Sequence, residues 1–160
     1  QVIEINSWQT KRISKLVVDK LFGTLSNKKI GILGFSYKSN TNDTRESPAI
    51  RICNDLLDEG AILQIYDPKV SKEQIEKDLI NENLTKGSWH FFNSIEETSL
   101  GSDALLILTE WEEFSEINWE LIAKKMRSPS WVFDTRLISN VSESRKYGIN
   151  LWTVGKGEII

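Results

Sequence analysis

The chain has 160 residues, of which 27% are charged, and a formal net charge of -3 at pH 7. This length suits one domain with a substantial core, and the acidic balance excludes the basic surface that binds nucleic acid without sequence preference. Its single cysteine, Cys53, excludes an internal disulfide and a multi-cysteine zinc site. The apolar stretches are far too short to span a membrane, and no signal-peptide pattern opens the chain, so we expect a cytoplasmic protein in a reducing compartment.

An amphipathic helix is predicted over residues 3–25. Its apolar positions are spaced three or four residues apart and so lie on one stripe. They are Ile13, Leu16, Val17 and Leu21. No capping signal precedes this helix. Such a beginning fits either an exposed terminus or a segment taken from a larger protein, and we favour the larger protein.

The next segment combines a buried strand, a polar loop and a helix start. Residues 30–33 are apolar without alternation, which is typical of a strand covered on both faces. Ser47 and Pro48 are the residue types of an N-cap and a first helical position, and Gly60 fits the end of that helix. Its apolar face comprises Ala49, Ile52, Cys53, Leu56 and Leu57. A strand that leads through a loop into a helix places backbone N–H groups and the positive helix end where anions bind.

Strands and helices alternate along the rest of the chain. We predict further strands at residues 61–66, 89–92, 103–109, 131–133 and 151–154, and helices at residues 71–79, 94–100 and within 110–126. The expected apolar contacts of the last helix are Ile117, Leu121 and Ile122. We interpret residues 80–88 as a surface loop and residues 155–160 as a loose tail. The alternation predicts an α/β fold with a doubly wound, mostly parallel sheet.

In sheets of this kind, ligands bind beyond the carboxyl ends of the strands. The polar residues that follow the predicted strands are therefore candidate site residues, and they comprise residues 37–45, Asp67, residues 109–111 and residues 134–136. Lys38 and Arg136 suit phosphate or carboxylate groups, because both stay cationic and Arg bonds through a planar fork. The alternative is that Lys38 is a solvated loop charge and that Arg136 pairs with Asp134 or Glu110.

Other candidates also have two interpretations. Tyr37 either contacts a base or a sugar with its ring or closes the core. Asp67 either binds a ribose or starts a turn with Pro68, and we favour the turn. Arg45 either meets a ligand or forms a structural pair at the helix start. Cys53 lies on the apolar helix face, and we interpret it as a buried, unreactive thiol.

The glycines near the first loop do not form a dinucleotide-binding fingerprint. In the pattern G-x-G-x-x-G, the middle glycine lets a pyrophosphate approach the backbone, and Leu33 stands there between Gly31 and Gly34. The loop is therefore not predicted to hold a dinucleotide by this motif.

Four motifs in order resemble the C-terminal domain of UDP-glucose 6-dehydrogenases. They are residues 32–48, residues 66–68 (Tyr-Asp-Pro), residues 109–111 (Thr-Glu-Trp) and residues 134–136 (Asp-Thr-Arg). The resemblance covers nearly the whole chain. It implies a Rossmann-like domain that closes over a UDP-sugar, within an enzyme that oxidises UDP-glucose to UDP-glucuronate with two NAD. The catalytic cysteine and most of the NAD site lie in other domains of these enzymes, so this domain alone is expected to be inactive.

The resemblance also implies roles for individual residues. Tyr37, Lys38 and Arg136 match positions that bind the UDP-sugar, and Arg45 matches an arginine that reaches toward NAD. The family more often has Phe at position 37 and Gly at position 135, and the second difference bears on the turn that aims Arg136. No catalytic residue and no metal ligand is implied within this chain.

The same resemblance implies a division of the chain. Residues 1–25 match the end of a central helix that joins the domains and supports dimerisation, and residues 26–160 match the UDP-sugar-binding domain. The complete enzyme is therefore expected to be a homo-oligomer. Two alternatives stay open. The first is a dehydrogenase of the same family for another nucleotide sugar, such as UDP-N-acetylmannosamine or GDP-mannose, and the second is a stand-alone nucleotide-binding or interaction module.

Overall fold

A computed structural model describes residues 7–79 and 86–154 of the chain. The described residues form a six-stranded sheet with the order β3-β2-β1-β4-β5-β6, in which every pair of neighbours is parallel. The strands are β1 (Lys29–Leu33), β2 (Ile62–Tyr66), β3 (Ser88–Phe91), β4 (Ala104–Ile107), β5 (Trp131–Asp134) and β6 (Asn150–Thr153). The order reverses between β1 and β4, which is the switch point of a doubly wound sheet. The predicted fold class is confirmed.

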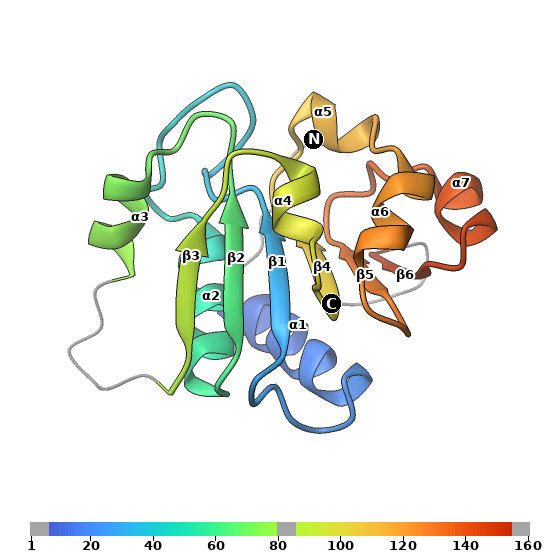
Figure 1. The fold of residues 1–160 in the computed structure, drawn as a ribbon. Helices are drawn as coiled ribbons and strands as arrows, with labels where there is room; N and C mark the ends of the chain where they lie inside the picture. The colour runs from blue at the N-terminus through green and yellow to red at the C-terminus, as the bar shows by residue number, and fades with distance from the viewer. Residues whose placement is uncertain (1–6, 80–85, 155–160) are drawn as a thin grey trace.

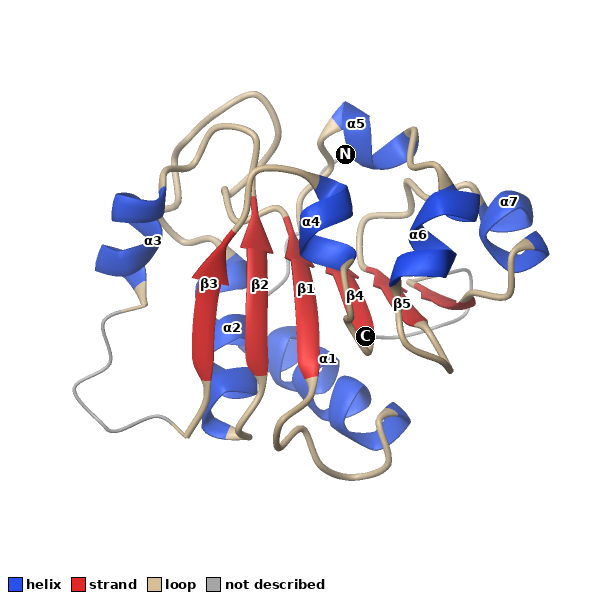
Figure 2. Ribbon diagram, viewed as in Figure 1, coloured by secondary structure: helices blue, strands red, loops and turns tan. Residues whose placement is uncertain are grey.

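Helices cover both faces of this sheet, as Figure 1 and Figure 2 show. Two of them, α1 (Ser7–Lys20) and α2 (Pro48–Asp58), lie behind the sheet in this view, and α4 (Ile95–Ser99) and α6 (Trp119–Lys125) lie in front of it. The others are α3 (Lys72–Asp78), α5 (Glu112–Ser115) and α7 (Val141–Lys146). None of the helices within the described ranges is long and apolar enough to cross a membrane.

The strands contribute to two cores, one on each face of the sheet. In β4, Ala104 and Leu106 join the core formed with α1 and α2, and Leu105 and Ile107 join the core that includes α6. Successive side chains of a strand point to opposite faces, so a strand covered on both faces is apolar at every position. The unbroken apolar run of β4 follows from this double coverage.

The first helix ends earlier than predicted. Residues 3–6 lie outside the described residues, and α1 ends at Lys20 and not at residue 25. Phe22 and Gly23 have φ angles of 68° and 84°, and an α-helix cannot continue through this left-handed region. The ammonium group of Lys28 donates hydrogen bonds to two carbonyl oxygens just past the end of α1. The chain therefore turns away before the predicted limit.

The buried stripe of α1 agrees with its prediction. Ile13, Val17 and Leu21 are at most 2% exposed and belong to the same core as α2, and Leu16 is partly buried against that core. The hydroxyl of Ser14 also donates a hydrogen bond to the Asp55 carboxylate on α2, at 3.0 Å. The first helix is thus packed into this domain, and the boundary at residue 25 stays a prediction.

Helix α2 has the predicted caps. The Ser47 hydroxyl accepts a hydrogen bond from the Ala49 N–H at 3.2 Å, and Pro48 is the first helical residue. Gly60, with a φ of 89°, follows the end of the helix. The predicted apolar face is buried, and it comprises Ala49, Ile52, Cys53, Leu56 and Leu57. This helix start is one of the supports of the loop described below.

The region after β4 differs from its prediction. The single helix expected within residues 110–126 is two helices, α5 and α6. Leu121 is wrongly predicted as an apolar contact, because its side chain is 36% exposed. Ile122 is buried as predicted, and Phe114 and Trp119 supply buried contacts that the pattern did not indicate. These three residues come from both helices, so no single apolar stripe runs through the region.

The sequence pattern does not predict α7. Residues 141–146 read Val-Ser-Glu-Ser-Arg-Lys and offer no apolar period, and the buried residue of this helix is Ser144. Its start is set by the Asn140 side chain, which accepts a hydrogen bond from the Glu143 N–H at 3.1 Å. Residues 80–85 and 155–160, predicted to form part of a loop and a tail, lie outside the described residues.

Candidate ligand site at the carboxyl edge of the sheet

The loop of residues 34–47 leaves the carboxyl end of β1 and rises above the strand ends (Figure 1). Strands β4 and β5 end at the same edge, and the segments after them carry Glu110 and Arg136. The candidate residues therefore gather at the switch point of the sheet, where ligands of doubly wound folds bind.

Gly34 and Thr109 fit closely together where this loop begins. Gly34 has a φ of +97°, and a Cβ atom on it would lie 2.5 Å from the Thr109 Cβ atom. The Thr109 hydroxyl donates a hydrogen bond to the Ser36 carbonyl oxygen at 3.0 Å. From the other side, the Ser47 hydroxyl donates to the Phe35 carbonyl oxygen at 2.8 Å. The start of the loop is thus fixed both to the end of β4 and to the start of α2.

The Asp67 carboxylate holds the same stretch from the end of β2. One oxygen, Oδ2, accepts hydrogen bonds from the N–H groups of Phe35 at 2.7 Å and Ser36 at 3.0 Å, and from Trp111 Nε1 at 3.3 Å. The other oxygen, Oδ1, accepts from the N–H groups of Lys69 and Val70. Asp67 is 3% exposed. The turn interpretation is confirmed, because both oxygens of this buried carboxylate are bonded within the protein.

Arg136 and Glu110 form an ion pair between the ends of β5 and β4. Arg136 Nη2 lies 2.8 Å from Glu110 Oε2, and the side chains are 7% and 30% exposed respectively. The second oxygen, Glu110 Oε1, accepts a hydrogen bond from the Ser39 N–H at 3.1 Å. One carboxylate therefore joins the guanidinium group of Arg136 to the loop that carries Lys38.

The second predicted partner of Arg136, Asp134, has a different role. Its Oδ1 accepts a hydrogen bond from the Arg136 backbone N–H at 2.9 Å. Its Oδ2 accepts from the N–H groups of Ile138 at 2.9 Å and Ser139 at 2.7 Å. Asp134 thus shapes the turn after β5, and Glu110 bonds the side chain of Arg136.

Glu110 is held in its charged form by its surroundings. Burial by itself would raise the pKa of this carboxyl group, since it disfavours the charge. Hydrogen bonds from its own backbone N–H, from Arg136 and from Ser39, together with the charge of Arg136, outweigh burial and place the pKa of Glu110 below its ordinary value. The pair is therefore ionic around neutral pH.

Lys38 and Tyr37 immediately precede Ser39 in the loop. The Lys38 side chain is exposed and that of Tyr37 is half-buried. The Lys38 carbonyl oxygen accepts a hydrogen bond from the Ser36 hydroxyl, and the Tyr37 N–H donates to the Asp43 carbonyl oxygen, both at 2.8 Å. The backbone beneath both side chains is thus fixed, and the Lys38 ammonium group is accessible to a ligand.

Residues 31–141 match the UDP binding domain of the UDP-glucose/GDP-mannose dehydrogenase family. The chain belongs to this family. It is 40% identical over 162 residues to UDP-glucose 6-dehydrogenase of Drosophila melanogaster and 42% identical over 163 residues to that of Gallus gallus. Each alignment covers 98% of this chain but only 34% and 33% of those proteins. The chain thus spans about a third of the length of these relatives.

Solved structures of the dehydrogenase family share the fold. A UDP-D-ManNAc dehydrogenase from Pyrococcus horikoshii superimposes with a TM-score of 0.69 at 27% identity, covering 94% of this chain and 31% of that protein. A UDP-glucose dehydrogenase from Pyrobaculum islandicum gives a TM-score of 0.67 at 21% identity, over 94% of this chain and 30% of that protein. The predicted Rossmann-like architecture is confirmed.

Arg45, the fourth predicted site residue in this UDP binding domain, lies within residues 40–46 of the loop. It pairs with Asp43 at 3.0 Å, and the side chains are 88% and 38% exposed. The hydrogen bond from the Arg45 side chain is the main cause that lowers the pKa of Asp43 to about 2. The alternative of a structural pair thus has support, although Arg45 pairs with Asp43 within the loop and not with a residue at the helix start.

The sequence places Glu110 among the candidate residues after the strands and as one possible partner of Arg136, but it does not indicate the bond to Ser39. Glu110 also binds Ser39, a residue 71 positions earlier, and no local pattern signals a contact over that separation. The available signal was its position directly after the most apolar strand of the chain. Polar residues in that position reach the carboxyl edge of a doubly wound sheet.

Other reactive groups of the domain lie away from this edge. Cys53 is fully buried on α2, and burial raises the pKa of its thiol, so it is unreactive as predicted.

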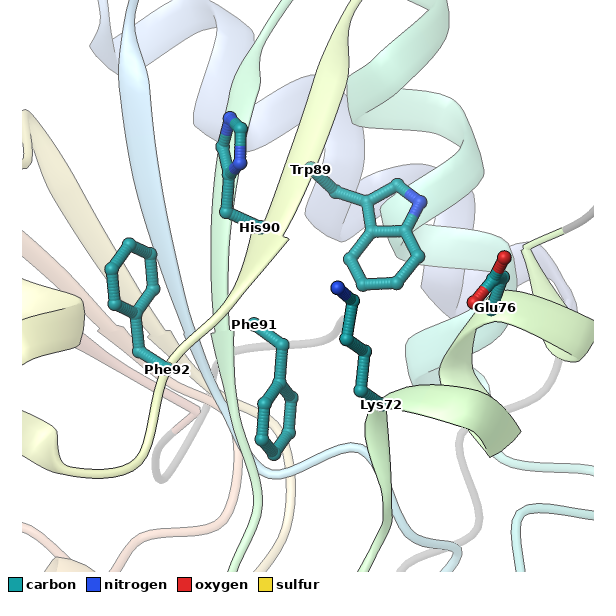
Figure 3. A pocket seen from close by; sticks show the side chains of 6 residues that line it. All are labelled: Lys72, Glu76, Trp89, His90, Phe91 and Phe92. Carbon is teal, nitrogen blue, oxygen red and sulfur yellow. The ribbon is translucent and has the colours of Figure 1, made fainter.

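A hollow of about 500 Å³ lies beside the outer strand β3 (Figure 3), and strands β2, β1 and β4 separate β3 from β5. Its lining residues are Lys72, Glu76, Trp89, His90, Phe91 and Phe92. Within the described ranges, no group of three or more His, Cys, Asp or Glu residues is placed to hold a metal ion.

Proposed function

We propose that this chain is the UDP-sugar-binding domain of a UDP-glucose 6-dehydrogenase, which oxidises UDP-glucose to UDP-glucuronate with two NAD. The single observation that carries the proposal is the meeting of the Lys38 loop, Glu110 and Arg136 at the switch point of a UDP binding domain. Identities of about 40% to UDP-glucose 6-dehydrogenases over 98% of the chain support the choice of sugar. The reacting groups would come from the other domains of the enzyme.

In this proposal the domain orients the nucleotide sugar and performs no chemistry itself. Lys38 supplies a point charge to the diphosphate, and Arg136 supplies a planar fork. A guanidinium group can bond a carboxylate along one edge and a phosphate along another, so the pair with Glu110 is compatible with ligand binding. The ring of Tyr37 contacts the nucleotide sugar beside Lys38. Holding the sugar in one place contributes to the rate through orientation.

Arg45 is proposed to reach toward NAD, which is bound mainly by another domain. The Arg45 side chain is 88% exposed and is carried on residues 40–46 of the loop, which supports a contact across a domain boundary. The complete enzyme is further proposed to be a cytoplasmic homo-oligomer. The single, buried cysteine supports a reducing compartment, since no disulfide is needed to hold this domain together.

The central test uses the complete dehydrogenase. Lys38→Ala and Arg136→Ala should each raise the KM for UDP-glucose by about tenfold, the loss expected for one charge-assisted contact, and leave the KM for NAD nearly unchanged. Lys124→Ala is the matched control, because Lys124 is an exposed lysine on α6 away from the strand ends. An unchanged KM for UDP-glucose in both site variants contradicts the proposal.

Two further measurements separate the alternatives. Comparison of kcat/KM for UDP-glucose, UDP-N-acetylmannosamine and GDP-mannose should favour UDP-glucose, and a preference for either other sugar would reassign the substrate within the family. Titration of the chain itself with UDP should give weak binding, since half of the site lies in other domains. Tight, saturable binding by the chain alone would instead favour a stand-alone nucleotide-binding module.

A further inference from the structure

Glu110 connects the two segments that carry the proposed UDP-sugar ligands. It follows β4, which lies between β1 and β5 in the sheet. Its Oε2 lies 2.8 Å from Arg136 Nη2, and its Oε1 lies 3.1 Å from the Ser39 backbone nitrogen. The two oxygens of one side chain therefore bond one segment on each side.

We propose that Glu110 is a positioning residue for nucleotide-sugar binding. Its carboxylate orients the Arg136 guanidinium group and holds the backbone next to Lys38, so that both cations are in place before the diphosphate arrives. This inference rests on the proposed function of the site and adds a residue that touches no ligand itself.

Charge alone argues against a carboxylate at this place. A negative group beside Arg136 repels an incoming diphosphate and partly cancels the attraction of the guanidinium group. A role in geometry resolves this conflict, because a preformed arrangement lowers the cost of ordering the Arg136 side chain and the backbone beside Lys38 on binding. The two views predict opposite effects when the charge of Glu110 is removed.

Burial makes the orientation of Arg136 depend on the groups that bond it, and Glu110 is one of these groups. The Arg136 side chain is only 7% exposed, and a guanidinium group at that depth is stable only with bonded partners. The neighbouring acid has a different task, because the two oxygens of Asp134 accept hydrogen bonds from the backbone N–H groups of Arg136, Ile138 and Ser139 and so hold the turn. Loss of the Glu110 carboxylate removes the ion pair at 2.8 Å and should therefore loosen the alignment of the Arg136 guanidinium group.

The loop has a second link to the end of β4, which makes a selective effect possible. The Thr109 hydroxyl bonds the Ser36 carbonyl oxygen at 3.0 Å, so the loop start stays attached when Glu110 is changed. The expected result is a local loss of alignment at Ser39 and Arg136 and not a collapse of the domain.

The experiment compares Glu110→Ala, Glu110→Gln, Arg136→Ala and the double variant Glu110→Ala/Arg136→Ala in the complete dehydrogenase. Glu110→Ala should raise the KM for UDP-glucose by about tenfold, the loss expected for a charge-assisted hydrogen bond, with the KM for NAD unchanged. Glu110→Gln keeps an oxygen for the Ser39 N–H and should give a smaller rise. The double variant should resemble Arg136→Ala, because Glu110 acts largely through Arg136.

The results distinguish failure of the positioning role from failure of the proposed function. The positioning role is overturned if Glu110→Ala lowers the KM for UDP-glucose or leaves it unchanged while Arg136→Ala raises it. The proposed function then still stands. An unchanged KM in Arg136→Ala and Lys38→Ala overturns the proposed function itself. Full additivity in the double variant also contradicts the inference. If Glu110→Ala does not fold, Glu110→Gln decides alone, and the exposed Glu120→Ala variant controls for loss of an acidic group.

Discussion

The two halves of the loop after β1 are held in different ways. Residues 34–39 are fixed by side chains from distant parts of the chain, namely Asp67, Thr109 and Glu110. Residues 40–46 rely on near neighbours. The Asp43 N–H donates to the Thr41 hydroxyl at 3.1 Å, and Arg45 bonds the Asp43 carboxylate two positions away.

This difference separates the two proposed ligand contacts of the loop. Bonds made by buried, distant groups are shielded from water and salt, whereas exposed local ion pairs contribute little and are screened. We therefore expect Lys38 to be presented in one arrangement and Arg45 to adjust to its partner. A fixed arrangement suits a residue that binds a substrate within one domain. An adjustable side chain suits a residue that reaches toward another domain.

Removal of the Asp67 carboxylate, which holds residues 34–39, should cause the largest loss of stability. Asp67→Ala leaves the buried N–H groups of Phe35 and Ser36 without an acceptor and should lower the free energy of unfolding by about 3 kcal/mol or more. Urea unfolding followed by circular dichroism measures this loss. Asp58→Ala, on the exposed face of α2, is the matched control and should change little. Equal effects of the two substitutions would show that Asp67 does not anchor the loop.

The close fit at Gly34 should give the next largest effect. Gly34→Ala forces a side chain into φ +97° and brings its Cβ to 2.5 Å from Thr109. Gly23→Ala is a sharp control, because Gly23 has a φ of +84° with nothing within 4 Å of the added Cβ. Both variants carry backbone strain, and the clash should cost Gly34→Ala about 2 kcal/mol more. If thermal unfolding midpoints fall equally, the contact with Thr109 is unimportant.

Protonation of Glu110 at acidic pH should lower the stability of the protein by less than either of these two substitutions. The pKa of Glu110 is lower in the folded protein than its ordinary value of 4.5, so the unfolded chain binds a proton first as the pH falls. Its contribution is complete above pH 4.5 and is lost as the pH falls through the lowered folded value. Stability measured between neutral and acidic pH should therefore fall less steeply in Glu110→Gln. Parallel curves for the two proteins would contradict this linkage.

A substitution within residues 40–46 of the loop should have the smallest effect on stability. Asp43→Asn removes one charge of an exposed pair and should leave the urea midpoint unchanged within error, because such pairs contribute little to stability. The KM for UDP-glucose in the complete dehydrogenase should also stay unchanged. A stability loss as large as that of Gly34→Ala would mean that both halves of the loop are equally anchored.

Local sequence patterns were sufficient for much of the fold. Ser47, Pro48 and Gly60 mark helix α2 within one residue, because caps depend on the chemistry of neighbouring positions. The apolar runs around Ile30–Leu33 and Ala104–Ile107 identify doubly covered strands. The same rules failed for α7, where the polar segment Val141–Lys146 folds because of its Asn140 cap and its place beside β6.

The candidate site was predictable only in part. The sequence placed Lys38 and Arg136 at strand ends, because the carboxyl edge of a parallel sheet collects such residues. It left the partner of Arg136 open between Asp134 and Glu110, and tertiary structure decides for Glu110. The bond from Ser39 to Glu110 spans 71 residues, and only the strand order β1-β4-β5 brings these residues together.

The framework of the loop and its recognition surface are made by different residues. The backbone at residues 34–39 is fixed by the side chains of Asp67, Thr109, Glu110 and Ser47, and the proposed recognition residues are Tyr37 and Lys38. Substitutions at positions 37 and 38 therefore alter the ring and the charge offered to a ligand without touching the bonds that shape the chain. A fold built this way can drift in ligand preference over evolutionary time while its architecture stays constant.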